Sequence, residues 1–205
     1  YRIMILRGEN MIQTTAMLLE KYNEYSNPKT KLGRMVKKGK YIKIARGLYE
    51  TDKNIPGYVL AGSIYGPSYI SFDFALGYYG LIPERVNIIT SATFDKKKNK
   101  SYKNSYGIFT YRDVPSEVFP YGIRLNKYKD YFFRIAEPEK AICDKLYTIS
   151  PVVSQKDLED LLIKDLRIEV SELDKLDIQK LEFLSEKYHS TNVSRFYRFM
   201  RRFKK

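Results

Sequence analysis

The sequence has very few of the side chains on which disulfide and soft-metal chemistry depend. Its 205 residues include one cysteine, Cys143, and one histidine, His189. A single cysteine excludes an intramolecular disulfide and a thiolate zinc site. Cys143 lies in an expected helix, where a buried structural thiol is the simplest interpretation. No nucleophile is suggested near His189, so we expect a surface residue at a helix end rather than a catalytic base.

The chain also lacks an unbroken apolar run of the roughly 20 residues that a membrane-spanning helix needs. Its least charged stretch, residues 55–83, carries Asp73 as the one formal charge, and Gly66-Pro67 interrupts it near the middle. We predict two short core helices here, joined by a tight turn. Val59, Leu60 and Ile64 mark the first helix. The second helix is expected to be capped by Ser71 or Asp73 and to end at Gly80.

We expect no secretion signal at the amino terminus. YRIMIL is too short for one, and Arg7 and Glu9 follow it. We therefore expect a cytoplasmic protein with no membrane partner. Met11 is a candidate natural start, which would make residues 1–10 an extension.

Acidic residues are scarce in three parts of the chain, whose net formal charge is +13. Residues 1–54 hold 12 basic and 5 acidic side chains, residues 85–134 hold 11 and 4, and residues 190–205 hold 6 and none. Residues 151–189 are the acidic exception, with 6 and 10. The excess of positive charge favours a polyanionic partner.

The first basic block has the pattern of a helix-turn-helix with a wing. Residues 13–25 and 29–38 have helical spacing, with a break at Asn27-Pro28 and a closing Gly39. Residues 41–45 and 48–51 alternate like strands around Arg46-Gly47. In such a module one helix enters the major groove while flanking cations hold phosphates. The candidate DNA-binding residues are Thr30, Lys31, Arg34, Lys37, Lys38, Lys40, Lys43 and Arg46; the competing interpretation is a solvated basic face.

The rest of the chain mixes strands with helices. We predict strands at residues 86–90, 105–112 and 132–136, with 122–125 as a partner strand, and helices from Pro138 to 147 and at 157–162, 177–188 and 193–203. This pattern predicts an α+β fold, with an N-terminal winged-helix-like module over residues 1–54 and a mixed α/β C-terminal domain over residues 55–205.

No catalytic constellation, metal site or cofactor site is recognised. A nucleotidyltransferase needs a Gly-Ser pair and then two carboxylates one residue apart. Gly62-Ser63 and Asp73 are present, but Ala75 stands where the second acid should be, and we interpret Gly62 as a helix-packing glycine. There is no Walker loop and no dinucleotide fingerprint. We expect a protein that is not an enzyme.

Two further groups of cations are candidate binding surfaces. A polar loop over residues 95–103 carries Lys96, Lys97, Lys98, Lys100 and Lys103. The last helix carries Arg195, Arg198 and Arg202 on the side opposite its apolar residues. Arginine suits planar and phosphate partners, so the arginine stripe is the more specific of the two.

Six stretches, in this order and spacing, resemble the AbiEi family of antitoxins from bacterial type IV toxin–antitoxin systems. They are KLGRMVKKGKYIKIARGLYETDKN, YISFDFALGYYGLIPE, ITSATF with its lysine loop, YGIFTYRDVPSEVFPYGI, IAEPEKAICDKLY and LDIQKLEFLSEKYHSTNVSRFYRFM. The resemblance covers nearly the whole chain from about Met11. The sequence departs from the family pattern at its start, where two helices instead of three precede the wing.

The resemblance implies an antitoxin that also acts as a transcriptional autorepressor. The N-terminal winged helix would bind repeats in the promoter DNA of its own operon. The C-terminal domain would oppose a nucleotidyltransferase-like toxin without a stable complex, in a system linked to phage defence. The lysine loop and the arginine stripe are then the candidate antitoxin face.

Two other functions stay open. In the first, the antitoxin acts by direct protein–protein contact, with a basic C-terminal face covering an acidic toxin surface. In the second, the chain binds RNA, since Tyr102 and Tyr106 stand among the lysines and tyrosine rings can stack on bases.

Overall fold

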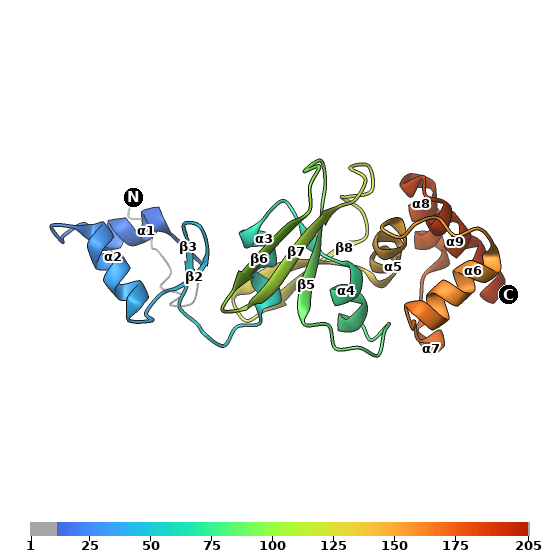
Figure 1. The fold of residues 1–205 in the computed structure, drawn as a ribbon, viewed down its shortest axis with the longest axis horizontal. Coiled ribbons are helices and arrows are strands. Elements are labelled where there is room, and N and C mark those ends of the chain that lie inside the picture. Colours follow the sequence, from blue (N-terminus) through green and yellow to red (C-terminus); the bar gives the residue numbers. More distant parts are fainter. Residues whose placement is uncertain (1–11, 205) are drawn as a thin grey trace, which may run out of the picture.

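The described residues form three parts that follow one another along the molecule. The structure is a computed structural model in which residues 12–204 are described, so the expectations for residues 1–10 and Met11 lie outside the described residues. Figure 1 shows a small unit of helices and a hairpin, then a sheet, then a cluster of helices that ends with the C-terminus. The predicted α+β class is confirmed. Within residues 12–204, no helix combines the length and the apolar character needed to span a bilayer.

The N-terminal unit contains helices α1 (Thr15–Lys21) and α2 (Pro28–Lys37) and a sheet in the order β1-β3-β2. Its strands are β1 (Gln13–Thr14), β2 (Ile42–Ala45) and β3 (Leu48–Glu50). The first helix starts later than predicted, because residues 13–14 pair with β3. Asn27 caps α2 by accepting a hydrogen bond from the Thr30 amide at 3.0 Å. The described part of this unit has two helices before its hairpin, so the winged-helix assignment stays a prediction.

A six-stranded mixed sheet in the order β6-β7-β5-β4-β9-β8 forms the centre of the molecule. The strands are β4 (Tyr69–Ile70), β5 (Ile88–Thr93), β6 (Lys100–Asn104), β7 (Gly107–Asp113), β8 (Ile123–Tyr128) and β9 (Tyr131–Ala136). The β5–β7 and β4–β9 pairs are parallel and the other pairs are antiparallel. The predicted pairing of residues 122–125 with the strand near residue 132 is confirmed.

Two local predictions for this region are corrected. The second half of the expected lysine loop is strand β6, which pairs with β7. The expected tight turn between the two core helices contains strand β4, which lies between β5 and β9. Both residues of β4 are buried, and a two-residue strand gives no periodicity from which the sequence could reveal it.

Helices cover both faces of the sheet. The 3-10 helix η1 (Gly57–Leu60) and helix α3 (Ala61–Ile64) lie on one face, where the Tyr111 hydroxyl donates to the Ala61 carbonyl at 2.7 Å. Helix α4 (Phe72–Tyr78) lies on the other face, where the Phe74 amide donates to the Thr90 hydroxyl at 3.0 Å. Helix α5 (Pro138–Tyr147) packs beside α4 and starts at the predicted proline.

The C-terminal helices pack against α5. They are α6 (Gln155–Asp160) with a π-helical turn at Leu161–Asp165, α7 (Val170–Leu173), α8 (Ile178–Tyr188) and α9 (Thr191–Phe203). Three of them match the predicted helices, with shifts at their ends. The short α7 lies in the acidic block and was not predicted.

The core crosses the predicted boundary at residue 54. Ile44, on the hairpin, belongs to the main apolar cluster, whose other buried members all lie within residues 55–205. A separate small cluster of Leu18, Tyr22, Leu32 and Tyr41 holds the N-terminal unit together.

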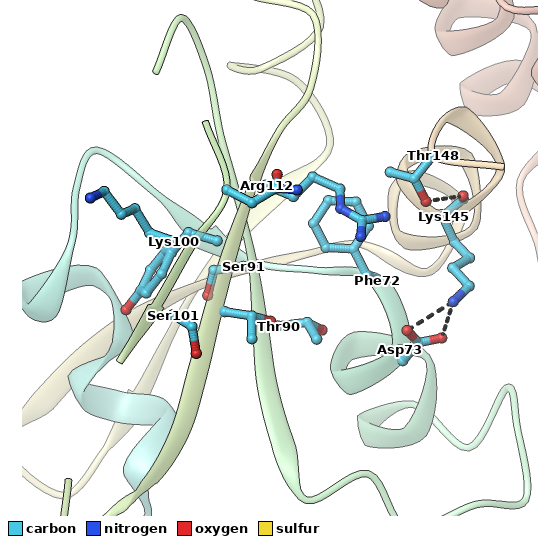
Figure 2. A pocket seen from close by; sticks show the side chains of 12 residues that line it. Phe72, Asp73, Thr90, Ser91, Lys100, Ser101, Arg112, Lys145 and Thr148 are labelled. Atoms are coloured by element: carbon cyan, nitrogen blue, oxygen red, sulfur yellow. Dashed lines mark hydrogen bonds and ion pairs between the residues drawn. The ribbon is translucent and has the colours of Figure 1, made fainter. Parts of the chain in front are cut away.

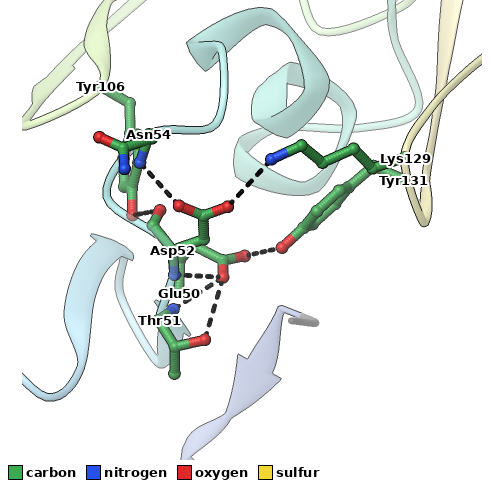
Figure 3. A network of polar contacts seen from close by, with 7 residues as sticks. All are labelled: Glu50, Thr51, Asp52, Asn54, Tyr106, Lys129 and Tyr131. Atoms are coloured by element: carbon green, nitrogen blue, oxygen red, sulfur yellow. Dashed lines mark hydrogen bonds and ion pairs between the residues drawn. The ribbon is translucent and has the colours of Figure 1, made fainter. Parts of the chain in front are cut away.

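Polar contacts also connect the N-terminal unit to the sheet, at what we call the domain junction (Figure 3). The buried Glu50 carboxylate accepts hydrogen bonds from the Tyr131 hydroxyl at 2.8 Å and from the Thr51 and Asp52 amides at 2.7 and 3.0 Å. The Tyr106 hydroxyl donates to the Asp52 carbonyl at 2.8 Å. The hairpin is thus attached to the sheet by side chains that come from both predicted domains.

A fully buried ion pair lies where the sheet meets α5 and α8. The Lys140 ammonium is 3.1 Å from the Asp144 carboxylate, and both side chains are 0% exposed. Asp144 also accepts hydrogen bonds from Ser71, Tyr188 and Tyr69 at 2.6, 2.5 and 3.0 Å. Burial, and then the charge of Asp144, raises the pKa of Tyr69 and of Tyr188 well above the usual value for tyrosine.

The raised pKa values of the buried tyrosines lead us to expect that the protein is less stable at high pH. Burial also raises the pKa of Tyr79 to about 12, and its buried hydroxyl has no hydrogen-bond partner among residues 12–204. Above about pH 10 the unfolded chain releases phenolic protons that the folded protein retains, so the free energy of unfolding falls as pH rises. We expect the melting temperature to decrease between pH 10 and 12, as measured by circular dichroism.

The variant Tyr79→Phe provides the matched comparison for this prediction. It removes a titrating group without breaking a hydrogen bond seen in the described residues, so it should melt like the wild type at pH 8. At pH 11 it should be more stable than the wild type by about 1 kcal/mol. Equal melting temperatures for the two proteins at pH 11 would show that Tyr79 titrates normally.

Candidate nucleic-acid interface

Helix α2 and the β2–β3 hairpin present the predicted DNA-binding residues on their outer surface. The inner side of α2 packs through the buried Leu32 and the half-buried Met35 and Val36. An amphipathic helix therefore directs its cations away from the core. The exposed members of the predicted set are Thr30, Arg34 and Lys37 on α2, Lys38 at its C-cap, and Lys40, Lys43 and Arg46 on or beside the hairpin.

Lys31 is the exception in this set. It is half-buried, and its ammonium lies 4.2 Å from the centre of the Tyr25 ring. A cation over an aromatic face is stabilised by the ring's quadrupole. Lys31 therefore has a partner within the protein.

The exposed cations of this set are unpaired among residues 12–204. None of the six makes an ion pair with another described residue, whereas Glu50 at the end of the hairpin is buried and fully hydrogen-bonded. Unpaired, solvated cations displace counterions from a nucleic-acid backbone when they bind phosphates. We call these six cations, with Thr30, the N-terminal basic surface.

The five lysines predicted at residues 96–103 do not form a single surface in the structure. Lys97 and Lys98 are exposed in the loop, while the half-buried Lys96 lies 5.5 Å from the Tyr65 ring centre. Lys100 and Lys103 are three residues apart on strand β6, so they point to opposite faces of the sheet. The predicted set is therefore divided between different surfaces.

Two of the three arginines of the stripe on α9 are exposed to solvent, and the third is bound within the protein. Its predicted inner face is confirmed, with Val193, Phe196 and Met200 buried. Arg198 and Arg202 are exposed. Arg195, predicted to line the outside, is half-buried, and its guanidinium donates to the Val153 carbonyl at 2.8 Å. Arg195 therefore fastens the segment before α6, a contact between segments far apart in the sequence.

The basic surfaces lie far from one another. Figure 1 shows α2 at one end of the molecule and α9 at the other, with the sheet between them. They form two separate surfaces, and one partner bound at α2 does not reach α9 without spanning the whole molecule.

The residues of the incomplete nucleotidyltransferase pattern have other contacts. The Asp73 carboxylate pairs with the Lys145 ammonium at 2.6 Å, and Ala75 is fully buried. The interpretation of Gly62 as a packing glycine is wrong, because Gly62 is exposed and a side chain there would meet nothing within 4 Å.

The single histidine and the single cysteine lie as predicted. His189 is exposed at the end of α8, where its φ of 48° closes the helix. Cys143 is fully buried, and burial raises the pKa of its thiol. A protonated, inaccessible thiol is a poor nucleophile.

The tyrosines proposed to stack on RNA bases are engaged within the protein. The half-buried Tyr102 lies 5.9 Å from Tyr65 and 5.8 Å from Tyr111 between ring centres. The Tyr106 hydroxyl is bound at the domain junction. Neither ring is presented as a free stacking platform, so these two residues give the RNA alternative little support.

Of the predicted surfaces, the N-terminal basic surface is therefore the one whose cations are gathered on a single small unit, exposed and unpaired within the described residues. Comparison with protein-family models and with curated proteins finds no match for this chain.

Proposed function

We propose that the chain is a DNA-binding antitoxin and autorepressor of a bacterial type IV toxin–antitoxin operon, without enzymatic activity of its own. The observation that carries the DNA-binding part is the N-terminal basic surface, whose six exposed cations lack partners among residues 12–204. The antitoxin part rests on the sequence resemblance to the AbiEi family. The proposed toxin is nucleotidyltransferase-like.

The shape of the surface supports duplex DNA as the partner. Helix α2 has ten residues and carries Thr30, Arg34 and Lys37 at spacings of four and three, on one side of the helix. A helix of this kind fits the major groove of B-DNA. The hairpin of the same unit carries the exposed Lys43 and Arg46, and we propose that these contact phosphates as a wing does.

Two substitutions on α2 test the DNA-binding proposal. Arg34→Ala is expected to weaken binding to the protein's own promoter by about 1–3 kcal/mol, as a base-edge contact. Lys38→Ala is expected to weaken binding to every duplex alike and to lower the salt slope by about one, as a phosphate contact. Fluorescence anisotropy with promoter and scrambled duplexes, over a range of NaCl concentrations, measures both effects.

Arg85→Ala is the matched control, because Arg85 is also exposed and lies outside the proposed surface. It should bind the promoter like the wild type, and all three variants should melt at the wild-type temperature. Wild-type affinity in both α2 variants would remove the DNA-binding proposal.

Rescue of cells that express the toxin from an independent promoter separates the two halves of the proposal. The α2 variants should lose repression and keep rescue. The double variant Arg198→Ala/Arg202→Ala should keep repression and lose rescue. Full rescue by the double variant would mean that α9 is an ordinary solvated face, and co-purification of the toxin would favour the direct-contact alternative.

A further inference from the structure

A cavity of about 360 Å³ lies between the open part of the sheet and helices α4 and α5. Figure 2 shows side chains from strands β5, β6 and β7 on one side of it and from the two helices on the other. The volume falls within the usual range for small-molecule sites. The lining residues that matter here are Thr110, Arg112, Ser101, Phe72, Asp73 and Lys145.

The sheet places polar side chains side by side on the floor of this cavity. Thr90 of β5, Thr110 of β7 and Ser101 of β6 are direct neighbours across three strands, so they share one face of the sheet. Arg112 is two residues beyond Thr110 and points to the same face. The hydroxyls of Ser101 and Thr110 make no hydrogen bond with other described residues and are free to bind a ligand.

Positive charge predominates in the cavity. Arg112 is exposed and makes no ion pair within residues 12–204. The Lys145 ammonium is held in place by Asp73, at 2.6 Å from one carboxylate oxygen and 2.9 Å from the other. Lys100 also lines the cavity, but Figure 2 shows its ammonium directed away from Arg112. The cations directed into the cavity are thus Arg112, which is unpaired among the described residues, and Lys145, which is paired with the one carboxylate; the excess of positive charge favours an anionic ligand.

The wall of the cavity at Phe72 is rigidly held. Phe72 has φ of 55°, a region that bulky residues rarely adopt. The hydroxyl of Thr90 donates to the Ser71 carbonyl at 2.6 Å and accepts from the Phe74 amide, which brackets Phe72 on both sides. Strained backbone of this kind persists only where the surroundings enforce it, and it is concentrated at ligand sites.

We propose that this cavity binds a small phosphate-bearing molecule of about the size of a nucleotide. The guanidinium of Arg112 holds the phosphate through paired hydrogen bonds, as arginine commonly does. Lys145 supplies a second positive charge, and the hydroxyls of Ser101 and Thr110 bind further phosphate or sugar oxygens. The site is separate from the N-terminal basic surface and goes beyond the proposed function.

Isothermal titration calorimetry with ATP, GTP, sodium tripolyphosphate and a single-stranded RNA hexamer tests the proposal on the full chain. Saturable one-to-one binding of at least one of the three small phosphate compounds is expected. Arg112→Ala should weaken it about tenfold or more, and Thr110→Val about two- to tenfold. Tighter binding of the nucleotides than of tripolyphosphate would identify a nucleotide ligand, and equal binding a polyphosphate ligand; both support the site.

Arg134→Ala is the matched control, because Arg134 is an exposed arginine on strand β9 of the same sheet, outside the cavity. It should leave the affinity unchanged. Melting temperatures check that each variant is folded. The proposal is overturned if none of the three small compounds binds, if Arg134→Ala weakens binding as much as Arg112→Ala, or if only the RNA hexamer binds.

Discussion

Replacing Asp144 with alanine is expected to lower the free energy of unfolding by about 3–5 kcal/mol. The substitution leaves the Lys140 ammonium 0% exposed without its carboxylate. It also removes the acceptor of three hydroxyl groups, which belong to Ser71, Tyr69 and Tyr188. An uncompensated buried charge is among the most destabilising changes that a folded protein undergoes. Urea unfolding followed by circular dichroism measures the loss.

Asp73→Ala is the matched control for this prediction. It deletes the same kind of side chain from another Asp–Lys pair, but both partners are partly exposed, at 39% for Asp73 and 21% for Lys145. Water and salt screen such a pair, so the cost should be below about 1 kcal/mol. Similar losses for the two variants would show that the Lys140–Asp144 pair is not an essential part of the core.

A second substitution, at Lys140, tests how much of the lost stability is due to the buried charge. Lys140→Met removes the buried positive charge and keeps a long side chain beside Gly122, where an added Cβ would lie 3.0 Å from the Cβ of Lys140. In the background of Asp144→Asn, which still offers an oxygen to the hydroxyls, Lys140→Met should recover part of the stability lost. No recovery would mean that the hydroxyl contacts, and not the buried charge, dominate the effect.

Glu50→Ala is expected to lower the free energy of unfolding by about 2–4 kcal/mol, because it removes the acceptor of several hydrogen-bond donors at the domain junction. The carboxylate accepts from the Tyr131 hydroxyl and from the Thr51 and Asp52 amides (Figure 3). Each buried donor left without an acceptor costs about 1–3 kcal/mol, and entering water offsets part of this. Chemical unfolding gives the stability, and limited proteolysis near residue 54 reports whether the hairpin has loosened.

Asp52→Asn provides the comparison for Glu50. Its side chain keeps an oxygen for the Asn54 amide and loses only a 3.6 Å pair with Lys129, which is about half exposed. We expect a change of less than about 1 kcal/mol and no new cleavage. If Glu50→Ala behaves like Asp52→Asn, the Glu50 carboxylate adds little to the junction, and the packing of Ile44 and the Tyr106–Asp52 hydrogen bond hold it.

The sequence determined the elements whose signals are local. Asn27-Pro28 starts α2, Pro138 starts α5 and Asp177 caps α8, because a capping oxygen or a proline acts within one turn of its own position. The apolar face of α9 follows from helical spacing in the same way. The exposed cations of the N-terminal basic surface could be predicted too, since the side opposite an apolar stripe faces solvent.

Tertiary structure alone decided the features that join distant segments. Strand β4 exists because Ile70 pairs with Ile135, and Ile44 joins the main core because the hairpin packs against the sheet. Arg195 is tied to Val153, and Arg112 lines a cavity with Lys145, for the same reason. A charged residue has the same local pattern whether it is solvated, paired or part of a binding site. Its role depends on which remote backbone and side-chain atoms the fold brings within a few ångströms, and spacing along the chain does not contain that information.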